Sequence, residues 1–568
     1  GGTERAVIDS SGLSVTSGTI NGVGIASSIT NFTNSILISN DAGTGTLSSA
    51  NNNTGLGFEV FDDLTSGDDN VGVGVQALTK LTTGVQNTAI GSASLDANTS
   101  GNYNTAVGTS SLGANTTAEE NTALGWGAAE STTTGASNVA VGSQALADNT
   151  TGASNVAIGR EALHTNTTAS DNTAVGKHSL RLNTTGASNT AVGKDSLGTN
   201  TTGTEHVAVG SLALDANTTG NYNTAVGYNA LTTNTTGDEN TAVGNSALKL
   251  NTTGEYNTAL GLGSLQNSTT SSNNTAIGHA ALYANTTGAT NTAVGTDALK
   301  ANTTAANNTA VGYYSGQANT TGTQNVSLGA YSFYTNTQSN RNTALGYNTL
   351  SSHNLTSDSN GYNTCVGFQA GSDVTTGTQN TFIGGLVGDT TTTGAANTAS
   401  GYLALTANTS GSSNTAFGKD SLGANTTGNA NVAVGKDALK ANTTADGNTA
   451  VGFDALTTNI TGAKNTAVGG NAGILCTGAG NTFIGADSGV AVTSGNDNTL
   501  LGHDTDNVTS GDSNILIGYG ARNNSAGADA NIVIGNQVNG AGANTVRFGT
   551  SAGTATLTLD GSDTSWAA

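Results

Sequence analysis

The sequence contains no Pro and no Met, only two Cys, and few aromatic (4%) or charged (9%) residues. It has no long apolar run and no amphipathic helical face, which argues against a transmembrane segment, membrane insertion or a lipid-binding helix. It has no basic cluster, and its formal net charge of −22 argues against nucleic acid and anionic membranes as partners. Because a translated chain begins with Met, we expect this chain to be processed or incomplete at its start.

Asn, Thr, Ser, Ala and Gly dominate, with 81 Gly in 568 residues. Disordered chains share such compositions, but here the apolar residues recur at fixed places. The segment "NTAVGYNALTTNTTGDE" at 223–239 is followed directly by "NTAVGNSALKLNTTGEY" at 240–256. About 29 units align between residues 53 and 544, most of them seventeen residues long; the unit at 342–362 is longer and the last few are shorter. We therefore predict a repeat protein.

Counted from its first residue, a unit has Asn at position 1 in nearly every case, with His206 as an exception, and Thr, Val or Ile at position 2. Position 3 is usually Ala, position 4 is almost always Val, Ile or Leu, and position 5 is Gly. Positions 6 and 7 vary freely, positions 8 and 9 are most often Ala-Leu or Ser-Leu, and a polar turn such as "NTTG" follows. Such a unit cannot hold a helix pair but can hold two short strands and two turns. The pattern predicts an all-β fold, a parallel β-solenoid or β-roll of about 29 coils.

Stacking places identical residues of successive coils above one another at the strand spacing. We therefore expect the position 1 Asn side chains to form a ladder of amide hydrogen bonds. The Gly at position 5 would supply a turn conformation that a Cβ would obstruct. Cys365 and Cys476 lie six repeats apart, or roughly 30 Å at the strand spacing, which is too far for a disulfide within one chain. We expect both to be small buried residues.

The repeat boundaries suggest three parts. Residues 1–52 form a β connector, in which "NSILIS" at 34–39 is a degenerate first coil. Residues 53–544 form the repetitive shaft, and residues 545–568 form a C-terminal neck. Position 3 enlarges in late units, at Phe483, Leu500, Leu516 and Val533, while the coils shorten, which indicates a change of cross-section.

Both faces of the predicted strand are apolar or small, which indicates an oligomer. Side chains alternate across a strand, so positions 2 and 4 face one way and position 3 the other. A strand with two such faces is expected to be covered on both sides. We assign one side to the coil interior and the other to a neighbouring subunit.

Side-chain volume is exchanged between positions 3 and 9, as dense packing requires. The space they share is either the coil interior or the subunit interface. The exchanging pairs are Phe382 with Gly388, Phe483 with Gly489, and Ser327 with Phe333.

The units "SNVAVGSQAL" at 137–146 and "SNVAIGREAL" at 154–163, together with "NILIG" at 514–518, resemble the head repeat of trimeric autotransporter adhesins. That family has a shorter repeat and builds a left-handed parallel β-roll from three chains. The resemblance implies a left-handed homotrimer here. The longer repeat of this chain adds to a turn, so its cross-section differs from that of the family.

The two ends, "GGTERAVIDSSGLSV" at 1–15 and "NTVRFGTSAGTATLTLDGSDTSWAA" at 544–568, resemble segments that flank the shafts of phage tail fibres. In those fibres a similar stretch leads into an intramolecular chaperone of the endosialidase type, which trimerises the fibre and cuts itself off. The resemblance implies a chaperone release point at Ala568, or else the end of a truncated chain.

No catalytic, cofactor-binding or metal-binding residues are predicted. The six His are scattered over the repeat and lack ligand spacing such as HExxH, so we expect them to be solvent-exposed surface residues. The nonapeptides of a calcium-binding β-roll are missing. A glycan-degrading tailspike needs two carboxylates across a groove, and such grooves are usually built by inserted loops, of which this array has almost none. A glycan-degrading spike is therefore a minor alternative.

Tyrosines at positions 6 and 7 could stack on sugar rings at the surface. We single out Tyr228, Tyr313, Tyr314 and Tyr347 as candidate glycan contacts, against the alternative of neutral surface variation. The "NTT" and "NTS" turns match the N-glycosylation pattern, and sequence alone does not decide whether they are modified.

These observations favour a non-enzymatic extracellular fibre without cofactors. The first hypothesis is a homotrimeric phage tail fibre shaft, part of a virion, that attaches to a host cell-surface glycan or protein receptor. The second is a microbial cell-surface adhesin or self-assembling extracellular filament.

Overall fold

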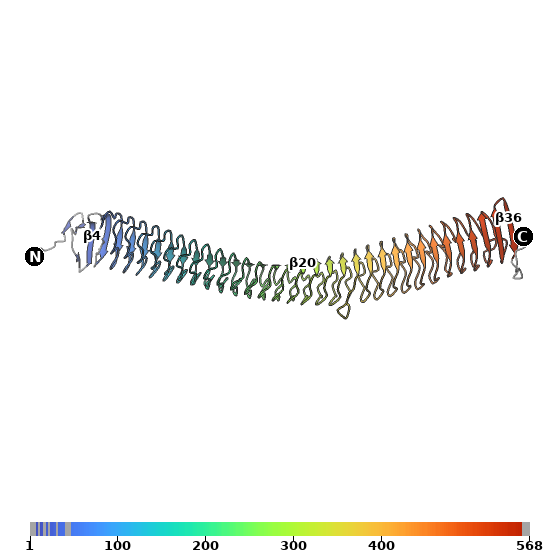
Figure 1. Cartoon of the computed structure of the whole chain (residues 1–568), viewed down its shortest axis with the longest axis horizontal. Helices are drawn as coiled ribbons and strands as arrows, with labels where there is room; N and C mark the ends of the chain where they lie inside the picture. The colour runs from blue at the N-terminus through green and yellow to red at the C-terminus, as the bar shows by residue number, and fades with distance from the viewer. Residues whose placement is uncertain are drawn as a thin grey trace. The chain divides into compact units, whose positions relative to one another are not determined.

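The fold is described from a computed structural model, which describes residues 7–9, 12–14, 19–20, 23–29, 32–39 and 47–558. The contacts divide the chain into two units, residues 1–280 and 281–568, each of which is a stack of β-strands (Figure 1). Among the described residues there is no helix. The prediction of an all-β parallel solenoid with a spacing of about seventeen residues is confirmed.

The first unit contains β1 (Val7–Asp9), β2 (Gly12–Ser14), β3 (Thr19–Ile20), β4 (Val23–Ile29), β5 (Phe32–Ser39), β6 (Thr54–Leu56), β7 (Val71–Val73), β8 (Thr88–Ile90), β9 (Thr105–Val107), β10 (Thr122–Leu124), β11 (Val139–Val141), β12 (Val156–Ile158), β13 (Thr173–Val175), β14 (Thr190–Val192), β15 (Val207–Val209), β16 (Thr224–Val226), β17 (Thr241–Val243), β18 (Thr258–Leu260) and β19 (Thr275–Ile277).

The second unit contains β20 (Thr292–Val294), β21 (Thr309–Val311), β22 (Val326–Leu328), β23 (Thr343–Leu345), β24 (Thr364–Val366), β25 (Thr381–Ile383), β26 (Thr398–Ser400), β27 (Thr415–Phe417), β28 (Val432–Val434), β29 (Thr449–Val451), β30 (Thr466–Val468), β31 (Thr482–Ile484), β32 (Thr499–Leu501), β33 (Ile515–Ile517), β34 (Ile532–Asn536), β35 (Thr545–Thr550) and β36 (Gly553–Thr558).

Within each unit every short strand pairs in parallel with the equivalent strand of the next coil. In the first unit Ala140 pairs with Ala157, and Ala157 with Ala174, so equivalent positions stack. The longer coil keeps this register, because Ala344 pairs with Cys365 and the extra residues project beyond the row of turns (Figure 1). Antiparallel pairs stand at the far ends of the two stacks, β4 with β5 and β35 with β36.

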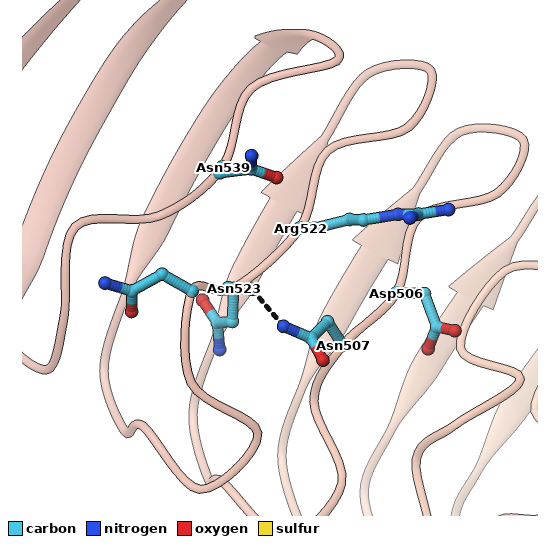
Figure 2. A pocket seen from close by; sticks show the side chains of 6 residues that line it. Asp506, Asn507, Arg522, Asn523 and Asn539 are labelled. Atoms are coloured by element: carbon cyan, nitrogen blue, oxygen red, sulfur yellow. Dashed lines mark hydrogen bonds between the residues drawn. The ribbon is translucent and has the colours of Figure 1, made fainter.

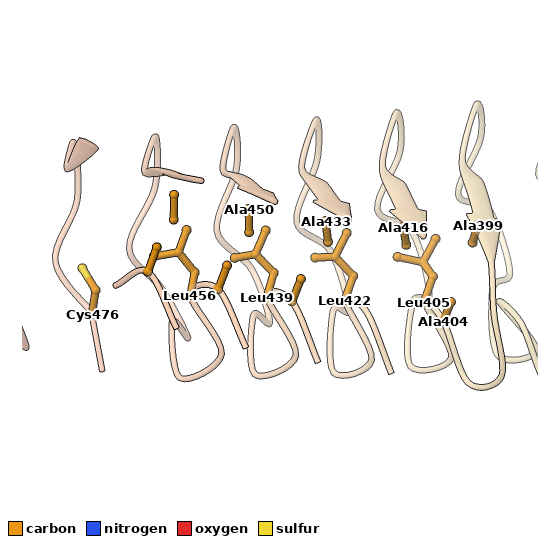
Figure 3. Packing of buried hydrophobic residues seen from close by; sticks show 14 of the residues in the cluster. Ala399, Ala404, Leu405, Ala416, Leu422, Ala433, Leu439, Ala450, Leu456 and Cys476 are labelled. Atoms are coloured by element: carbon orange, nitrogen blue, oxygen red, sulfur yellow. The ribbon is translucent and has the colours of Figure 1, made fainter. Parts of the chain in front are cut away.

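Position 3 points into the interior of the coil, which we call the lumen, and position 9 reaches it from the opposite wall. In the second unit Ala416 and Leu422 belong to one continuous buried row with Ala433 and Leu439 (Figure 3). The exchange of side-chain volume between positions 3 and 9 therefore takes place in the lumen. Phe382 and Phe483 are fully buried in the lumen, and a Cβ at Gly388 would lie 2.7 Å from the Phe382 ring.

The first unit exchanges volume in the same way at Phe61, a position 9 residue that is fully buried. A Cβ at Gly55 would lie 3.1 Å from its ring, and one at Gly72 would lie 3.3 Å from it. These are the position 3 residues of the same coil and of the next. Dense packing therefore couples one large side chain to small residues both within and between coils.

The position 1 asparagines form the predicted ladder, which Asn240 illustrates. The Asn240 Nδ2 donates to Asn223 Oδ1 at 3.2 Å and to the Gly254 carbonyl at 2.8 Å, and its backbone N–H also donates to Asn223 Oδ1. The side chain therefore binds the preceding coil and closes its own coil. Asn supplies the two donors and one acceptor that this buried site requires.

A second ladder, which the sequence analysis treated only as a polar turn, runs through position 12. The Asn200 Nδ2 donates to Asn183 Oδ1 at 2.8 Å and to the Gly203 carbonyl at 2.9 Å. The Gly203 carbonyl also accepts from the position 1 amide of Asn189 at 3.0 Å. In a coil with Asn at both positions, one carbonyl oxygen thus accepts hydrogen bonds from two buried side-chain amides. The Thr at position 13 adds a third row, in which Thr201 Oγ1 donates to the Thr218 carbonyl at 2.9 Å.

Backbone conformation explains the restricted residue choice in the turns. Gly244, at position 5, has φ of 135°, and a Cβ there would lie 2.5 Å from the Gly261 carbonyl oxygen, as predicted. Three other residues of this coil are left-handed: Ser246, Leu248 and Tyr256 have φ of 57°, 51° and 57°. β-Branched side chains disfavour that region, and neither Val nor Ile occupies positions 7 or 9 of any coil. The prediction that position 7 varies freely was therefore wrong.

Candidate functional surface

The outward face of the strands carries a row of apolar side chains in each unit. Positions 2 and 4 point away from the lumen, and position 4 is Val, Ile or Leu in nearly every coil. Leu124 and Leu260 are 48% and 45% exposed in the first unit, and Leu328, Ile383 and Phe417 are also exposed in the second. We call the position 4 side chains the outer row.

The sequence predicted that both faces of each strand are covered, and the single chain covers one of them. Position 3 is covered by the lumen, whereas the opposite face of the same strand lies open in the single chain. Parallel strands are ordinarily covered on both faces, and a contiguous exposed apolar surface marks an interaction site. The outer row is therefore a candidate interaction surface.

Three of the four candidate tyrosines, Tyr228, Tyr313 and Tyr347, are exposed, and Tyr314 is half-buried. The structure brings Tyr313, Tyr314 and Tyr347 into one group with three residues that the sequence analysis did not select. We call this group the aromatic cluster: Tyr313, Tyr314, Tyr331, Tyr334, Tyr347 and Phe368. Tyr228 lies in the other unit and is not a member. The additional members could have been predicted by comparing positions 6 and 7 of adjacent coils in the sequence.

Ring contacts connect the aromatic cluster across four consecutive coils. The Tyr331 ring lies 5.5 Å from the Tyr313 ring and 6.2 Å from the Tyr347 ring, both edge to face. The Tyr347 and Phe368 rings are stacked, 5.7 Å apart and 11° from parallel. Interaction with the Tyr314 hydroxyl raises the pKa of Tyr313, and burial raises that of Tyr331. These hydroxyls therefore remain protonated hydrogen-bond donors at neutral pH.

The coil that follows Tyr331 carries the inserted residues, and polar contacts fasten them. The Asn340 Nδ2 donates to Asp358 Oδ1 at 2.7 Å. The Arg341 guanidinium donates to the Tyr362 hydroxyl at 2.8 Å and lies 5.8 Å from the centre of its ring. The inserted turn is thus fixed to the coil before it.

A polar hollow of about 500 Å³ lies where the last coils shorten (Figure 2). It is lined by Asp506, Asn507, Arg522, Asn523, Asn524 and Asn539, which stand at positions 9 to 11 of their coils. Arg522 is already paired with Asp504 at 2.7 Å, and burial raises the pKa of Asp506. The hollow therefore lacks a free cation. The enlarged residues Phe483, Leu500, Leu516 and Val533 all face the lumen here, which supports the predicted change of cross-section.

The prediction that all six histidines are exposed was wrong for His206 and His353, which are buried, and His164 and His178 are half-buried. His206 replaces the position 1 Asn, and its Nε2 lies 2.7 Å from the Gly220 carbonyl while its Nδ1 accepts the Asn223 N–H at 3.1 Å. His353 replaces the position 12 Asn, and its Nε2 lies 3.0 Å from Ser339 Oγ. Burial lowers the pKa of each to about 4. The His206 imidazole takes over hydrogen bonds of the ladder amide it replaces, whereas the buried His353 Nδ1 has no hydrogen-bond partner among the described residues.

The other histidines and the two cysteines offer no reactive centre of their own. His178 lies between two carboxylates, 3.4 Å from Glu161 and 3.1 Å from Asp195. Cys365 and Cys476 are free and buried, as expected, and burial raises the pKa of Cys476 to about 11. Among the described residues no group of three or more His, Cys, Asp or Glu is arranged to hold a metal ion. The predicted release point, Ala568, lies outside the described residues.

No protein-family model matches the chain, and a search of curated proteins finds no significant match. Over the described part of the chain, no helix has the length and apolar character needed to cross a membrane.

Proposed function

We propose that this chain is the shaft of a homotrimeric extracellular fibre, and specifically of a phage tail fibre that attaches a virion to a host cell surface. The observation that carries the proposal is the outer row. It runs along the coils of each unit, it is apolar in nearly every coil, and its side chains are exposed or half-buried in the single chain. Three chains in register would cover their outer rows against one another. The likeness of the repeat to trimeric adhesin heads supports the same stoichiometry.

The regularity of the stack supports a structural role. Each coil binds its neighbours through backbone pairing and side-chain ladders. A chain of this kind extends by adding coils, and its stability is a sum of coil and neighbour terms. We accordingly propose that it acts as a non-enzymatic spacer and adhesive element and uses no cofactor. The tail fibre assignment rests on the likeness of the chain ends to fibre flanks.

Native mass and shape test the proposal. Light scattering of the purified chain should give three times 55.5 kDa, and negative-stain images should show thin rods of uniform length. Polymers of indefinite length would instead favour a self-assembling filament. A compact monomer would overturn the trimeric fibre.

Paired substitutions locate the interface. Leu124→Asp with Leu260→Asp places two charges in the outer row and should shift the mass toward one chain, because a buried unpaired charge is costly. The matched control is Leu250→Asp. Leu250 is 37% exposed but stands at position 11, off the outer row, so its replacement should leave the mass unchanged. Equal effects of both changes would place the interface elsewhere.

A further inference from the structure

The side chains of the aromatic cluster form one surface through contacts between adjacent coils. Its position 6 members are Tyr313, Tyr347 and Phe368, and the coil between Tyr313 and Tyr347 has the small Ala330 at that position. Tyr331, at position 7 of that coil, lies over the gap and contacts both neighbouring tyrosines. The result is a continuous run of rings from the coil that begins at Asn308 to the one that begins at Asn363.

The three position 6 rings of the aromatic cluster are exposed, and the other three rings are half-buried. Tyr347 is 50% exposed and Phe368 is 53% exposed. Aromatic residues are otherwise rare in this chain, at 4% of the sequence. Six of them in contact on an open face form an apolar surface of the kind that marks a recognition site.

The chemistry around the rings indicates the class of ligand. Positions 6 and 7 of the four coils carry no charged residue, and between the rings they present the amides of Asn348 and Gln369. A nucleic acid or another polyanion would require cations at these positions. Tyrosine has an apolar ring with a polar hydroxyl at its edge, which suits a ligand that is apolar on one face and rich in hydroxyls at its rim.

We propose that the aromatic cluster is a binding platform for a neutral glycan, whose sugar rings stack on Tyr347 and Phe368 and whose hydroxyls bond to the tyrosine hydroxyls and the Asn348 and Gln369 amides. A polysaccharide matches the surface because both repeat along one direction: equivalent side chains of successive coils recur at the strand spacing of roughly 4.8 Å. This inference rests on the proposed adhesive function and names the receptor class and the residues.

The experiment uses the full chain on a printed array of bacterial surface polysaccharides, neutral and anionic, followed by titration of the strongest neutral hit with tyrosine fluorescence as the readout. The test variant is Tyr347→Ala with Phe368→Ala. The control is Tyr228→Ala, because Tyr228 is 52% exposed at the same position 6 and has no aromatic neighbour among the described residues. We expect the test variant to weaken binding roughly tenfold or more and the control to leave it unchanged.

Three results would overturn the platform: no neutral glycan bound by the wild-type chain, binding unaffected by the double substitution, or a double substitution that changes only the native mass. The last result would make the aromatic cluster a contact between protein chains. Thermal unfolding of each variant confirms that it is folded. Native mass, measured on the same samples, separates the two proposals: a trimer that binds no neutral glycan overturns only the platform, whereas a monomer overturns the fibre and leaves the array result interpretable.

Discussion

The ring of Phe483 lies where a side chain at Gly489 would stand: a Cβ on Gly489 would come within 2.4 Å of the ring. Gly473, in the coil before, is equally close, since a Cβ there would lie 2.5 Å from the same ring. One phenyl group therefore fills lumen space that Leu side chains fill in most other coils. The pair links two positions of the repeat that are six residues apart.

Gly489→Ala should destabilise the protein by about 1–3 kcal/mol, because it overpacks the lumen and the site has φ of 70°. Phe483→Ala should cost about 3–5 kcal/mol through the cavity it leaves. Combining Phe483→Ala with Gly489→Leu should restore part of that loss, since Ala and Leu fill these positions elsewhere. Melting temperatures of the wild type, Phe483→Ala, Gly489→Leu and the combined variant form a double-mutant cycle. Gly470→Ala is the control, because no atom lies within 4 Å of its Cβ. Additive effects would contradict the shared space.

Asn240→Leu should be among the most damaging single changes in the first unit. It removes the only acceptor of the Asn257 backbone N–H and one of the acceptors of the Asn257 amide, and leaving such a buried donor without a partner costs about 1–3 kcal/mol. Asn223 Oδ1 and the Gly254 carbonyl each lose one of two donors, since the Asn240 backbone N–H and the Asn251 amide remain. Asn245→Ala, an exposed position 6 residue five places along the chain, should change the melting temperature little. If the two variants melt together, the ladder contributes nothing to stability.

His206 should make stability depend on pH. Its folded pKa of about 4 lies below the ordinary value of 6.5, so the unfolded chain binds more protons between those values. Stability is therefore expected to be full above pH 6.5 and to fall as the pH drops toward 4, by on the order of 3 kcal/mol for this residue. His206→Asn, which restores the ladder residue, should lose that part of the dependence.

The control for this measurement is His503→Asn, because His503 is exposed and outside both ladders. Melting temperatures at pH 7, 5 and 4 for the wild type and both variants separate His206 from the titrating carboxylates. A wild-type profile that coincides with that of His206→Asn would refute the assignment.

The "NTT" turns should carry no N-linked glycan in folded protein. The Asn200 side chain is buried, and its Nδ2 already donates two hydrogen bonds. Peptide mapping of the protease-resistant fraction from a glycosylating host should find Asn200 unmodified. Asn507, in the motif Asn507-Val508-Thr509, is exposed and serves as the comparison site for modification. A glycan on Asn200 in the folded fraction would contradict the second ladder.

Sequence periodicity was sufficient to predict the solenoid, the position 1 ladder and the buried cysteines, because each depends on a residue type that recurs at one position. The side of the strand that holds Phe483 could not be assigned from the pattern, since the lumen and an interface both demand dense packing. The position 12 ladder was missed because "NTTG" is equally typical of an exposed turn. His206 was visible in the sequence as a replacement of the position 1 Asn, but its burial was missed because the sequence does not show that an imidazole can take part in the buried hydrogen bonds of that column.

The aromatic cluster was predicted in part. Tyr313, Tyr314 and Tyr347 were selected as single exposed residues, whereas the contacts through Tyr331 depend on the register between coils. The register places position 7 of one coil against position 6 of the next. This contact cannot be predicted from the residues of a single unit.

Each ladder residue contacts only the coil before it and the coil after it. The length of a stack is therefore set by the number of its coils. Removing a whole seventeen-residue unit from the interior of one stack would join two edges that already match, so the chain would become shorter without becoming misfolded. Gene duplication or loss of single units therefore sets the reach of the protein in equal steps. A unit shortened by one residue would keep the position 1 column, as the sixteen-residue coil before Asn481 does, where the Asn481 Nδ2 still donates to Asn465 Oδ1 at 3.1 Å.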